Sequence, residues 1–290
     1  MQKPIGQLLL GSGQPLLRMW DVDVEARNRP FVKHSHTRFE FTVVVSGAGE
    51  YTTERTVYPM EPGDIFVFSS NEVHCITKAG PAGLVMSNLH FEPRYLSEEF
   101  FEVAGESYIS FCYSHAPTFQ NRIPAAEAAV IRNHFEQMKA EFRQEQTQYP
   151  LAIRAHLQLM LVELLRSHGY QTPGTINGKH FELLEIFDYI DSHLDEEITL
   201  QDLAKLVNLS PNYLSHLFKK LNGTSLWEYI TAKRIERAVR LIRSRENDLT
   251  MLDIALQCGF NNTVNFNKAF KKHKGITPRE LRKDPGLLSY

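Results

Sequence analysis

The sequence predicts an α+β protein, in which an N-terminal β-barrel with flanking helices precedes an all-α domain. Three observations lead to this prediction. Short β-branched and aromatic runs fill the first third of the chain, the apolar spacing changes to three and four residues from about Pro124, and one helical unit occurs twice near the C-terminus. At 290 residues the chain is long enough for two domains, each with its own core.

The composition is that of an ordinary globular protein. Hydrophobic residues make up 42% and charged residues 23%, which excludes a disordered or fibrous chain, and the net charge of −2 does not indicate a nucleic-acid partner. Three scattered cysteines (Cys75, Cys112 and Cys258) exclude a disulfide framework and indicate thiols in a reducing compartment. No signal-peptide pattern opens the chain, and no apolar run approaches the ~20 residues that span a bilayer. We therefore expect a soluble, cytoplasmic protein.

The strands of the first third are bounded by turn residues. Phe39–Val45 is β-branched and aromatic and ends at Ser46–Gly49, while Ile65–Phe68 follows the turn sequence Glu61–Asp64 and is closed by Ser69–Asn71. Short strands between Gly, Pro and Asn turns are typical of a sandwich or small barrel.

Two amphipathic helices are predicted next. Apolar residues recur at helical spacing from Ile131 to Phe142, Pro150 is expected to break the pattern, and a second apolar stripe runs from Ile153 to Leu165. This pair, within residues 125–168, either packs on the β-domain or forms a subunit contact, and periodicity does not decide between the two.

Charge and composition divide the chain after this pair. Residues 169–178 have the composition of a linker, which predicts domains at 1–168 and 179–290. Residues 211–290 carry 15 basic and 7 acidic side chains, a local net charge of +8, whereas residues 181–202 carry eight acidic side chains and no basic one. A basic end on a neutral chain is typical of a nucleic-acid-binding module, although charge runs alone are more often solvated surfaces.

The C-terminal domain contains an internal repeat. Phe218-Lys219-Lys220 recurs 52 residues later as Phe270-Lys271-Lys272, and Gly223 corresponds to Gly275 at the same offset. Upstream the offset is 51, where Asp202-Leu203-Ala204 corresponds to Asp253-Ile254-Ala255. Two copies of one helix–turn–helix unit are therefore predicted, at about 199–221 and 250–273, with a longer turn in the second.

Each copy has helix-capping residues and a polar outer face. Thr199 with Asp202 has the form of a capping box, and Ser210 precedes Pro211 at the start of the next helix. Asn, Ser, Thr and His side chains reach base edges in a major groove, and Lys neutralises phosphate. The alternative is a helical hairpin that binds no DNA. The predicted DNA-binding residues are Ser210, Asn212, Tyr213, Ser215, His216, Lys219 and Lys220 in the first copy, and Asn261, Asn262, Thr263, Asn265, Asn267, Lys268, Lys271 and Lys272 in the second.

A long helix from Leu226 to about Ser244 is predicted to join the copies. About 18 residues at ~1.5 Å each span ~27 Å, close to the ~34 Å between successive major-groove faces. The basic side chains expected to point outward from it are Lys233, Arg234, Arg237, Arg240 and Arg243.

Residues from about 180 to 285 resemble the DNA-binding domain of the AraC/XylS family of bacterial transcription regulators. The resemblance is carried by Asp253-Ile254-Ala255, Gly259-Phe260, Phe266, Phe270-Lys271-Lys272 and Gly275-Ile276-Thr277-Pro278. Val264-Asn265 stand where the family usually has Ser-Tyr, so the base preference of the second recognition helix does not carry over.

The N-terminal histidines resemble a second known pattern. His34-Ser35-His36-Thr37-Arg38-Phe39-Glu40, followed by Gly47, is similar to the first cupin motif, and His74 stands where the second motif has its histidine. Ser69-Ser70-Asn71 replace that motif's Pro-x-Gly, and Lys78 replaces its Asn. Residues 30–90 thus resemble the cupin, or jelly-roll, sensor domain that commonly precedes this DNA-binding domain.

These residues offer two kinds of chemistry. His34, His36 and Glu40 share one strand face and, with His74 from a facing strand, could bind a divalent metal; alternatively they hydrogen-bond a polar ligand or each other. Lys78 argues against a metal if it points inward. The other candidate ligand residues, which could equally be core, are Trp20, Arg38, Tyr51, Phe66, Phe68 and His90.

The sequence therefore predicts a ligand-responsive, sequence-specific DNA-binding transcription regulator without catalytic activity or a required cofactor. We expect an activator that responds to a small polar ligand such as a sugar or oligosaccharide, forms a homodimer and acts with RNA polymerase. The main alternative is a metal-dependent cupin enzyme with a DNA-binding tail. A constitutive DNA-binding protein with an empty β-domain is a third.

Overall fold

The computed structural model describes residues 2–9, 15–24, 33–54, 56–96, 112, 119–168, 181–222, 224–244 and 249–288. Contacts between residues divide the chain into two compact units, one of residues 1–31 and 38–175 with residue 290, the other of residues 32–37 and 176–289. We describe each unit by itself and call them the β-unit and the α-unit. The predicted linker and Gly223 of the repeat lie outside the described residues.

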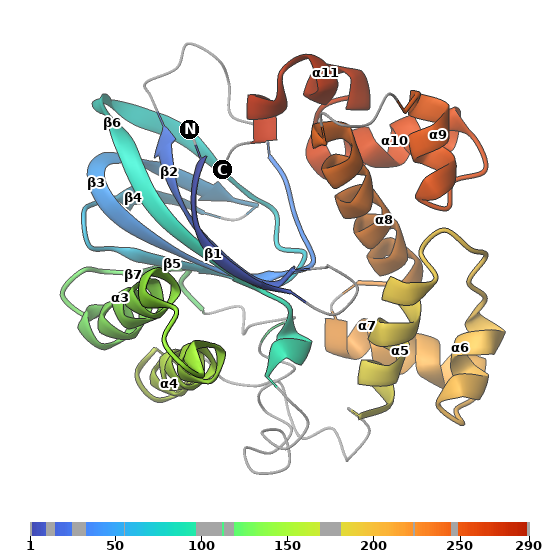
Figure 1. The fold of residues 1–290 in the computed structure, drawn as a ribbon, viewed down its shortest axis with the longest axis horizontal. Helices are drawn as coiled ribbons and strands as arrows, with labels where there is room; N and C mark the ends of the chain where they lie inside the picture. The colour runs from blue at the N-terminus through green and yellow to red at the C-terminus, as the bar shows by residue number, and fades with distance from the viewer. Residues whose placement is uncertain are drawn as a thin grey trace. The chain divides into compact units, whose positions relative to one another are not determined.

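The β-unit contains one antiparallel sheet (Figure 1). Its described strands run in the order β1-β2-β6-β3-β5-β7, with β4 paired to β3. They are β1 (Gln2–Leu9), β2 (Pro15–Val24), β3 (Phe39–Thr53), β4 (Val57–Met60), β5 (Ile65–Phe68), β6 (His74–Phe91) and β7 (Arg122–Ile123). The predicted strands at 39–45 and 65–68 are confirmed, because their β-branched and aromatic residues suit a surface that is buried on both sides.

One face of the sheet carries an apolar cluster of the β-unit. Alternation places residues of even number in β2, the start of β3 and the end of β6 on this face, which we call the inner face. Its buried apolar residues are Trp20, Val22, Val24, Val44, Tyr51, Tyr58, Met60, Phe66, Phe68, Ile76, Leu84 and Met86. The polar candidates Glu40 and His90 are directly opposite each other on the same face.

Two helices, α3 (Ala129–Gln144) and α4 (Tyr149–Ser167), lie along the sheet (Figure 1). The predicted apolar stripes are buried except at Leu165, which is half-buried. Lys139 is buried as well, and its Nζ reaches Asp21 Oδ1 of β2 at 3.4 Å. The position of the break was predicted wrongly. Pro150 stands in the first turn of α4, where a missing N–H costs nothing, and the turn at 145–148 has positive φ at Glu145 and Gln148 instead.

The described part of the α-unit after residue 180 is helical. Its helices are α5 (Phe181–Ser192), α6 (Leu200–Leu206), α7 (Pro211–Asn222), α8 (Leu226–Arg243), α9 (Met251–Gln257), α10 (Thr263–Lys274) and α11 (Pro278–Lys283). The described residues also include the 3-10 turns η1 (Pro93–Tyr95) in the β-unit and η2 (Pro285–Leu288) in the α-unit. Both predicted helix–turn–helix units are confirmed as α6–α7 and α9–α10, with α8 between them (Figure 1).

The caps behave as the sequence predicts. Thr199 accepts a hydrogen bond from the backbone N–H of Asp202, Ser210 from that of Tyr213, and Thr250 with Asp253 forms a full capping box. Side-chain oxygens thus satisfy N–H groups that a helix start leaves without a partner.

Lys233 of α8 is not where the sequence placed it. Lys233, expected to point outward, is 3% exposed, and its Nζ lies 3.1 Å from Asp191 Oδ1 of α5. A buried ammonium requires such a carboxylate partner. None of the helices in the described ranges is both long and apolar enough to cross a membrane.

Candidate functional site

Helix α7 presents the polar face that the sequence predicts. Leu214, Leu217 and Phe218 are buried, and Phe218 packs edge-on against Phe187 and Tyr229. A helix anchored by one apolar stripe exposes the opposite stripe. The predicted DNA-binding residues of this copy are all exposed: Ser210, Asn212, Tyr213, Ser215, His216, Lys219 and Lys220.

Helix α10 repeats this arrangement around Phe266 and Phe270, both fully buried. Thr263 is half-buried, and the other predicted residues are exposed: Asn261, Asn262, Asn265, Asn267, Lys268, Lys271 and Lys272. Two of them also have structural partners. Asn262 caps the helix through the N–H of Asn265, and Lys272 Nζ lies 3.1 Å from Glu228 Oε1 of α8. The exposed face of α10 is therefore mostly polar, with Val264 as an exposed apolar residue.

Arginines of α8 hold the α5–α6 connection and lie beside the turn of the second copy. Arg234 donates to the carbonyl oxygens of Leu194 (2.9 Å) and Glu196 (2.7 Å), and Arg237 pairs with Asp195 at 3.0 Å. Gly259 has φ of +75°, and a Cβ there would overlap the carbonyl oxygen of Leu194. Sequence reasoning treated these arginines as outward charges and missed this junction.

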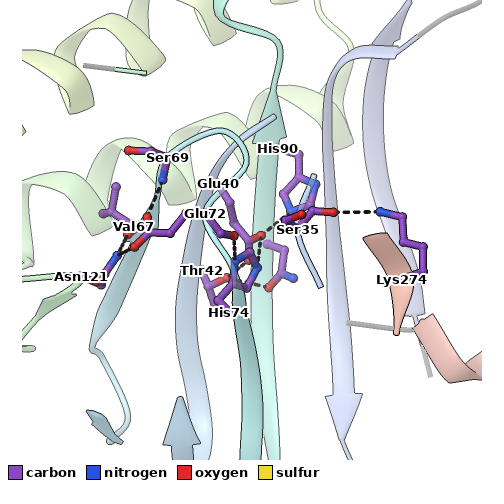
Figure 2. Close-up of polar contacts among 11 residues, drawn as sticks. Ser35, Glu40, Thr42, Val67, Ser69, Glu72, His74, His90, Asn121 and Lys274 are labelled. Atoms are coloured by element: carbon purple, nitrogen blue, oxygen red, sulfur yellow. Dashed lines mark hydrogen bonds and ion pairs between the residues drawn. The ribbon is translucent and has the colours of Figure 1, made fainter. Parts of the chain in front are cut away.

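Residues 33–37 group with the α-unit and form hydrogen bonds with α8 and α10. The backbone N–H and hydroxyl of Thr37 donate to Glu236 Oε1 of α8 at 2.8 and 2.9 Å. Lys274, at the end of α10, donates to the carbonyl oxygen of Ser35 at 2.9 Å (Figure 2). Glu236 and Lys274 are 7% exposed. Nothing in the spacing of residues so far apart in sequence signals these contacts.

The inner face of the β-unit carries a polar cluster centred on Glu40, which is 2% exposed (Figure 2). Its Oε1 accepts from the Thr42 hydroxyl at 2.6 Å, and its Oε2 lies 2.7 Å from His90 Nε2 and 3.4 Å from His74 Nε2. The Thr42 hydroxyl also contacts Asn88 at 3.3 Å. The hydrogen bonds from Thr42 and His90 stabilise a carboxylate that burial alone would disfavour.

A hydrogen bond on the side of the ring away from Glu40 fixes the orientation of His74. Its Nδ1 lies 2.9 Å from the carbonyl oxygen of Glu72, so Nδ1 carries the proton and Nε2 faces Glu40. The Glu72 carboxylate is in turn held by Asn121 Nδ2 (2.8 Å) and by the N–H of Ser69 (3.0 Å), as Figure 2 shows. Such a backing contact aims the second ring nitrogen toward a proton donor or a cation.

Aromatic rings surround this cluster. Trp20 meets His90 edge-on with centroids 4.5 Å apart, and Phe68 stacks on His74 at 4.1 Å. Tyr51 and Phe66, whose centroids are 5.1 Å apart, belong to the inner-face apolar cluster. The predicted aromatic candidates therefore share one face with Glu40, and each also packs in the core.

A pocket of about 540 Å³ opens beside Trp20, lined by Pro4, Gly6, Gln7, Arg18, Met19 and Trp20. Sequence reasoning missed Arg18, whose guanidinium lies 4.0 Å from the centre of the Trp20 ring. The alternation of Arg18 with Trp20 along one strand could have indicated it.

The remaining candidates divide between the two units. Arg38 pairs with Glu92 at 3.5 Å, and the side chain of Lys78 is 67% exposed beside Glu50, so Lys78 does not face His74. His34 and His36 belong to residues 33–37, with ring centroids 6.0 Å apart. The predicted metal set thus draws on both units and stays a prediction.

Comparisons with known proteins agree with this architecture. Residues 22–161 match the family model of the AraC-like ligand binding domain, and residues 203–284 match that of a helix-turn-helix domain. The HTH-type transcriptional activator RhaR of Cronobacter sakazakii is 25% identical over 261 residues, which cover 89% of each chain. An HTH-type transcriptional regulator of Staphylococcus aureus (strain COL) is 23% identical over 248 residues, but the match covers 83% of this chain and only 31% of that relative. The chain therefore spans about a third of the length of that relative.

A solved structure shows the same fold. Unsaturated fatty acid bound ToxT from Vibrio cholerae has a TM-score of 0.61 at 12% identity, covering 92% of this chain and 94% of that chain. The two family models fall on the β-sheet domain and on the paired helix–turn–helix units respectively. The chain therefore belongs to the AraC family of transcriptional regulators, with a ligand-binding and a DNA-binding domain.

Proposed function

We propose that this regulator is an activator that binds two adjacent major-groove faces and responds to a small polyhydroxylated ligand. The observation that carries the DNA-binding part is the repetition of α6–α7 as α9–α10, each with an anchored, polar and basic second helix. The relative RhaR, which is named as a transcriptional activator, supports the direction of regulation.

The recognition helices are the second helices of the two units, α7 and α10. In both of them, lysines contact phosphate and other polar residues contact bases. Lys219 and Lys271 neutralise phosphate, while Asn212, His216 and Asn265 reach base edges. Helix α8, with 18 residues, spans about 27 Å, which suits recognition of successive major-groove faces by one chain.

The chemistry around Glu40 favours a ligand rich in hydroxyl groups. A buried carboxylate with Thr42 and His90 as donors accepts further hydrogen bonds from hydroxyls and repels an acidic ligand. The fatty acid of the ToxT structure has a carboxylate, so we expect a different ligand class here. Trp20 provides an aromatic face for a sugar ring, and the adjacent Arg18 pocket provides the entry.

A divalent metal is the second candidate for the same place. Backing of His74 Nδ1 by a carbonyl oxygen is the arrangement that metal-binding histidines commonly have. Glu40 and His74 of the β-unit would be ligands of the ion, and such a site in a catalytic protein would correspond to the enzyme alternative.

We further propose that residues 33–37 transmit the ligand signal. This segment carries His34 and His36, precedes β3 directly, and is held by Glu236 and Lys274 of the α-unit. A ligand that engages either histidine would change the free energy of these contacts, and such couplings typically amount to ~1–3 kcal/mol.

The same proposal includes a homodimer that recruits RNA polymerase. Helices α3 and α4 expose Val130, Leu151 and Leu159, each at 48% or more, in an otherwise amphipathic pair. A second copy that covers these side chains would place two DNA-binding units on repeated half-sites.

Selection of bound fragments from a random DNA library at physiological salt tests the proposal. The wild-type chain should enrich a site with two repeats, and the variant with Lys219→Ala and Lys271→Ala should recover much less DNA of every sequence. The selection is repeated with sugar mixtures, and bound metal is measured by elemental analysis. No enriched sequence, together with stoichiometric metal and turnover that is lost in Glu40→Gln, would favour the enzyme instead.

A further inference from the structure

Two histidines from different helices of the β-unit face each other outside the Glu40 cluster. His134 of α3 and His156 of α4 approach with their Nδ1 atoms 3.1 Å apart. Their ring centroids are 5.3 Å apart, with an angle of 39° between the ring planes. Both side chains are half-buried, so water reaches the pair from one side.

The separation of the nitrogens suits chelation. Imidazole nitrogens bind zinc at about 2.0–2.1 Å, so two of them in a tetrahedral or octahedral arrangement lie roughly 2.9–3.4 Å apart. The observed 3.1 Å falls within this range without any movement of the helices. Zinc, nickel and copper all accept imidazole ligands.

The local electrostatics keep the pair ready for a metal ion. Burial lowers the pKa of His156, and the positive charge of a protonated His134 lowers it further, while Glu141 opposes the shift. The lone pair of a neutral imidazole nitrogen is the group that binds a metal ion.

We propose that His134 and His156 form a binding site for a divalent transition-metal ion, with water molecules as the remaining ligands. The ion would join α3 to α4 near the middle of both helices. Without metal, the two Nδ1 atoms share one proton in a hydrogen bond. This site is separate from the metal set predicted around Glu40, and it does not depend on the identity of the effector.

Copper binding to the chelator-stripped, full-length protein provides the first test. Electron paramagnetic resonance of the chain with one equivalent of Cu²⁺ should show at least two nitrogen ligands. Isothermal titration with Zn²⁺ and with Ni²⁺ should give a binding step that His134→Gln and His156→Gln each weaken at least about tenfold, or ~1.4 kcal/mol. His168→Gln, at the end of α4, is the matched control and should leave that step unchanged.

A His74→Gln variant separates this site from the Glu40 cluster. The proposed step persists in His74→Gln and disappears in His156→Gln, and circular dichroism confirms that each variant is folded. The proposal is overturned if wild-type protein binds no metal, or if binding is lost in His74→Gln but unchanged in both variants of the pair. Variants that lose this metal-binding step should still select the same DNA as the wild type through α7 and α10. Failure of the metal-site proposal is therefore distinguishable from failure of the proposed function.

Discussion

Glu40 and His90 stand opposite each other on β3 and β6, with Oε2 2.7 Å from Nε2. The carboxylate also accepts from Thr42, so a single buried group satisfies donors from two strands. Its surroundings make it a structural residue as well as a candidate ligand residue, and the two roles can be separated by substitution.

Replacement of Glu40 by Ala should lower the free energy of unfolding by about 2–3 kcal/mol. The change leaves the hydroxyl of Thr42 and the ring N–H of His90 buried without this acceptor. Glu40→Gln keeps an acceptor oxygen and should cost about half as much. Urea denaturation of the three proteins measures this, and equal midpoints would contradict the prediction.

Lysine and asparagine variants of α10 should affect DNA binding differently. Lys271→Ala should weaken binding to every sequence and reduce the salt slope by about 0.9, because one phosphate contact is lost. Asn265→Ala should cost about 1–3 kcal/mol on the preferred site and little on random DNA. Fluorescence anisotropy at several salt concentrations distinguishes the two. Equal losses on specific and random DNA in both variants would show that the assignment is wrong.

Gly259→Ala should disrupt the second helix–turn–helix unit. The φ of +75° disfavours any residue with a Cβ, and that Cβ would overlap the carbonyl oxygen of Leu194 and lie 2.7 Å from Arg234 Cζ. We expect a loss of more than about 3 kcal/mol in stability and no specific DNA binding. Gly275→Ala, at the C-terminal end of α10 with a similar positive φ, should lose about 1 kcal/mol. Similar denaturation curves for the two would contradict the packing argument.

Removal of one member of the buried Lys233–Asp191 pair should strongly lower the free energy of unfolding. Replacement of both by apolar residues should lower it much less. Lys233→Ala leaves a carboxylate with 6% exposure beside an empty space and should cost about 3–5 kcal/mol. Lys233→Met combined with Asp191→Leu should recover most of that loss. Lys205→Ala, an exposed lysine of α6, should change stability by less than about 0.5 kcal/mol. Thermal and urea unfolding report all three.

Stability of the α-unit should fall as pH decreases below 6.5. Burial, together with Lys274 and Lys272, lowers the pKa of His273 from 6.5 to about 4, against the opposing effect of Glu236 and Glu228. Between these values the unfolded chain binds a proton that the folded chain does not, so acid favours unfolding. His273→Gln should flatten this part of the profile between pH 6.5 and 4. The same pH dependence in both proteins would contradict the role of His273.

Local sequence was sufficient for the helices and their caps. Thr199, Ser210 and Thr250 are caps because a short polar side chain precedes an apolar stripe, and each acts within three residues. The repeat predicted the second unit from the first. The position of Pro150 was misread because proline fits a first helical turn as well as a break.

The sequence by itself determined the fold class, the paired helix–turn–helix units and the polar faces of α7 and α10, because periodicity and capping are properties of neighbouring residues. Only the tertiary structure decided that Lys233 is buried, that Glu236 holds Thr37, and that His134 meets His156. These contacts join residues far apart in the chain, and their formation depends on how helices and strands pack. Spacing along one sequence carries no information about that packing.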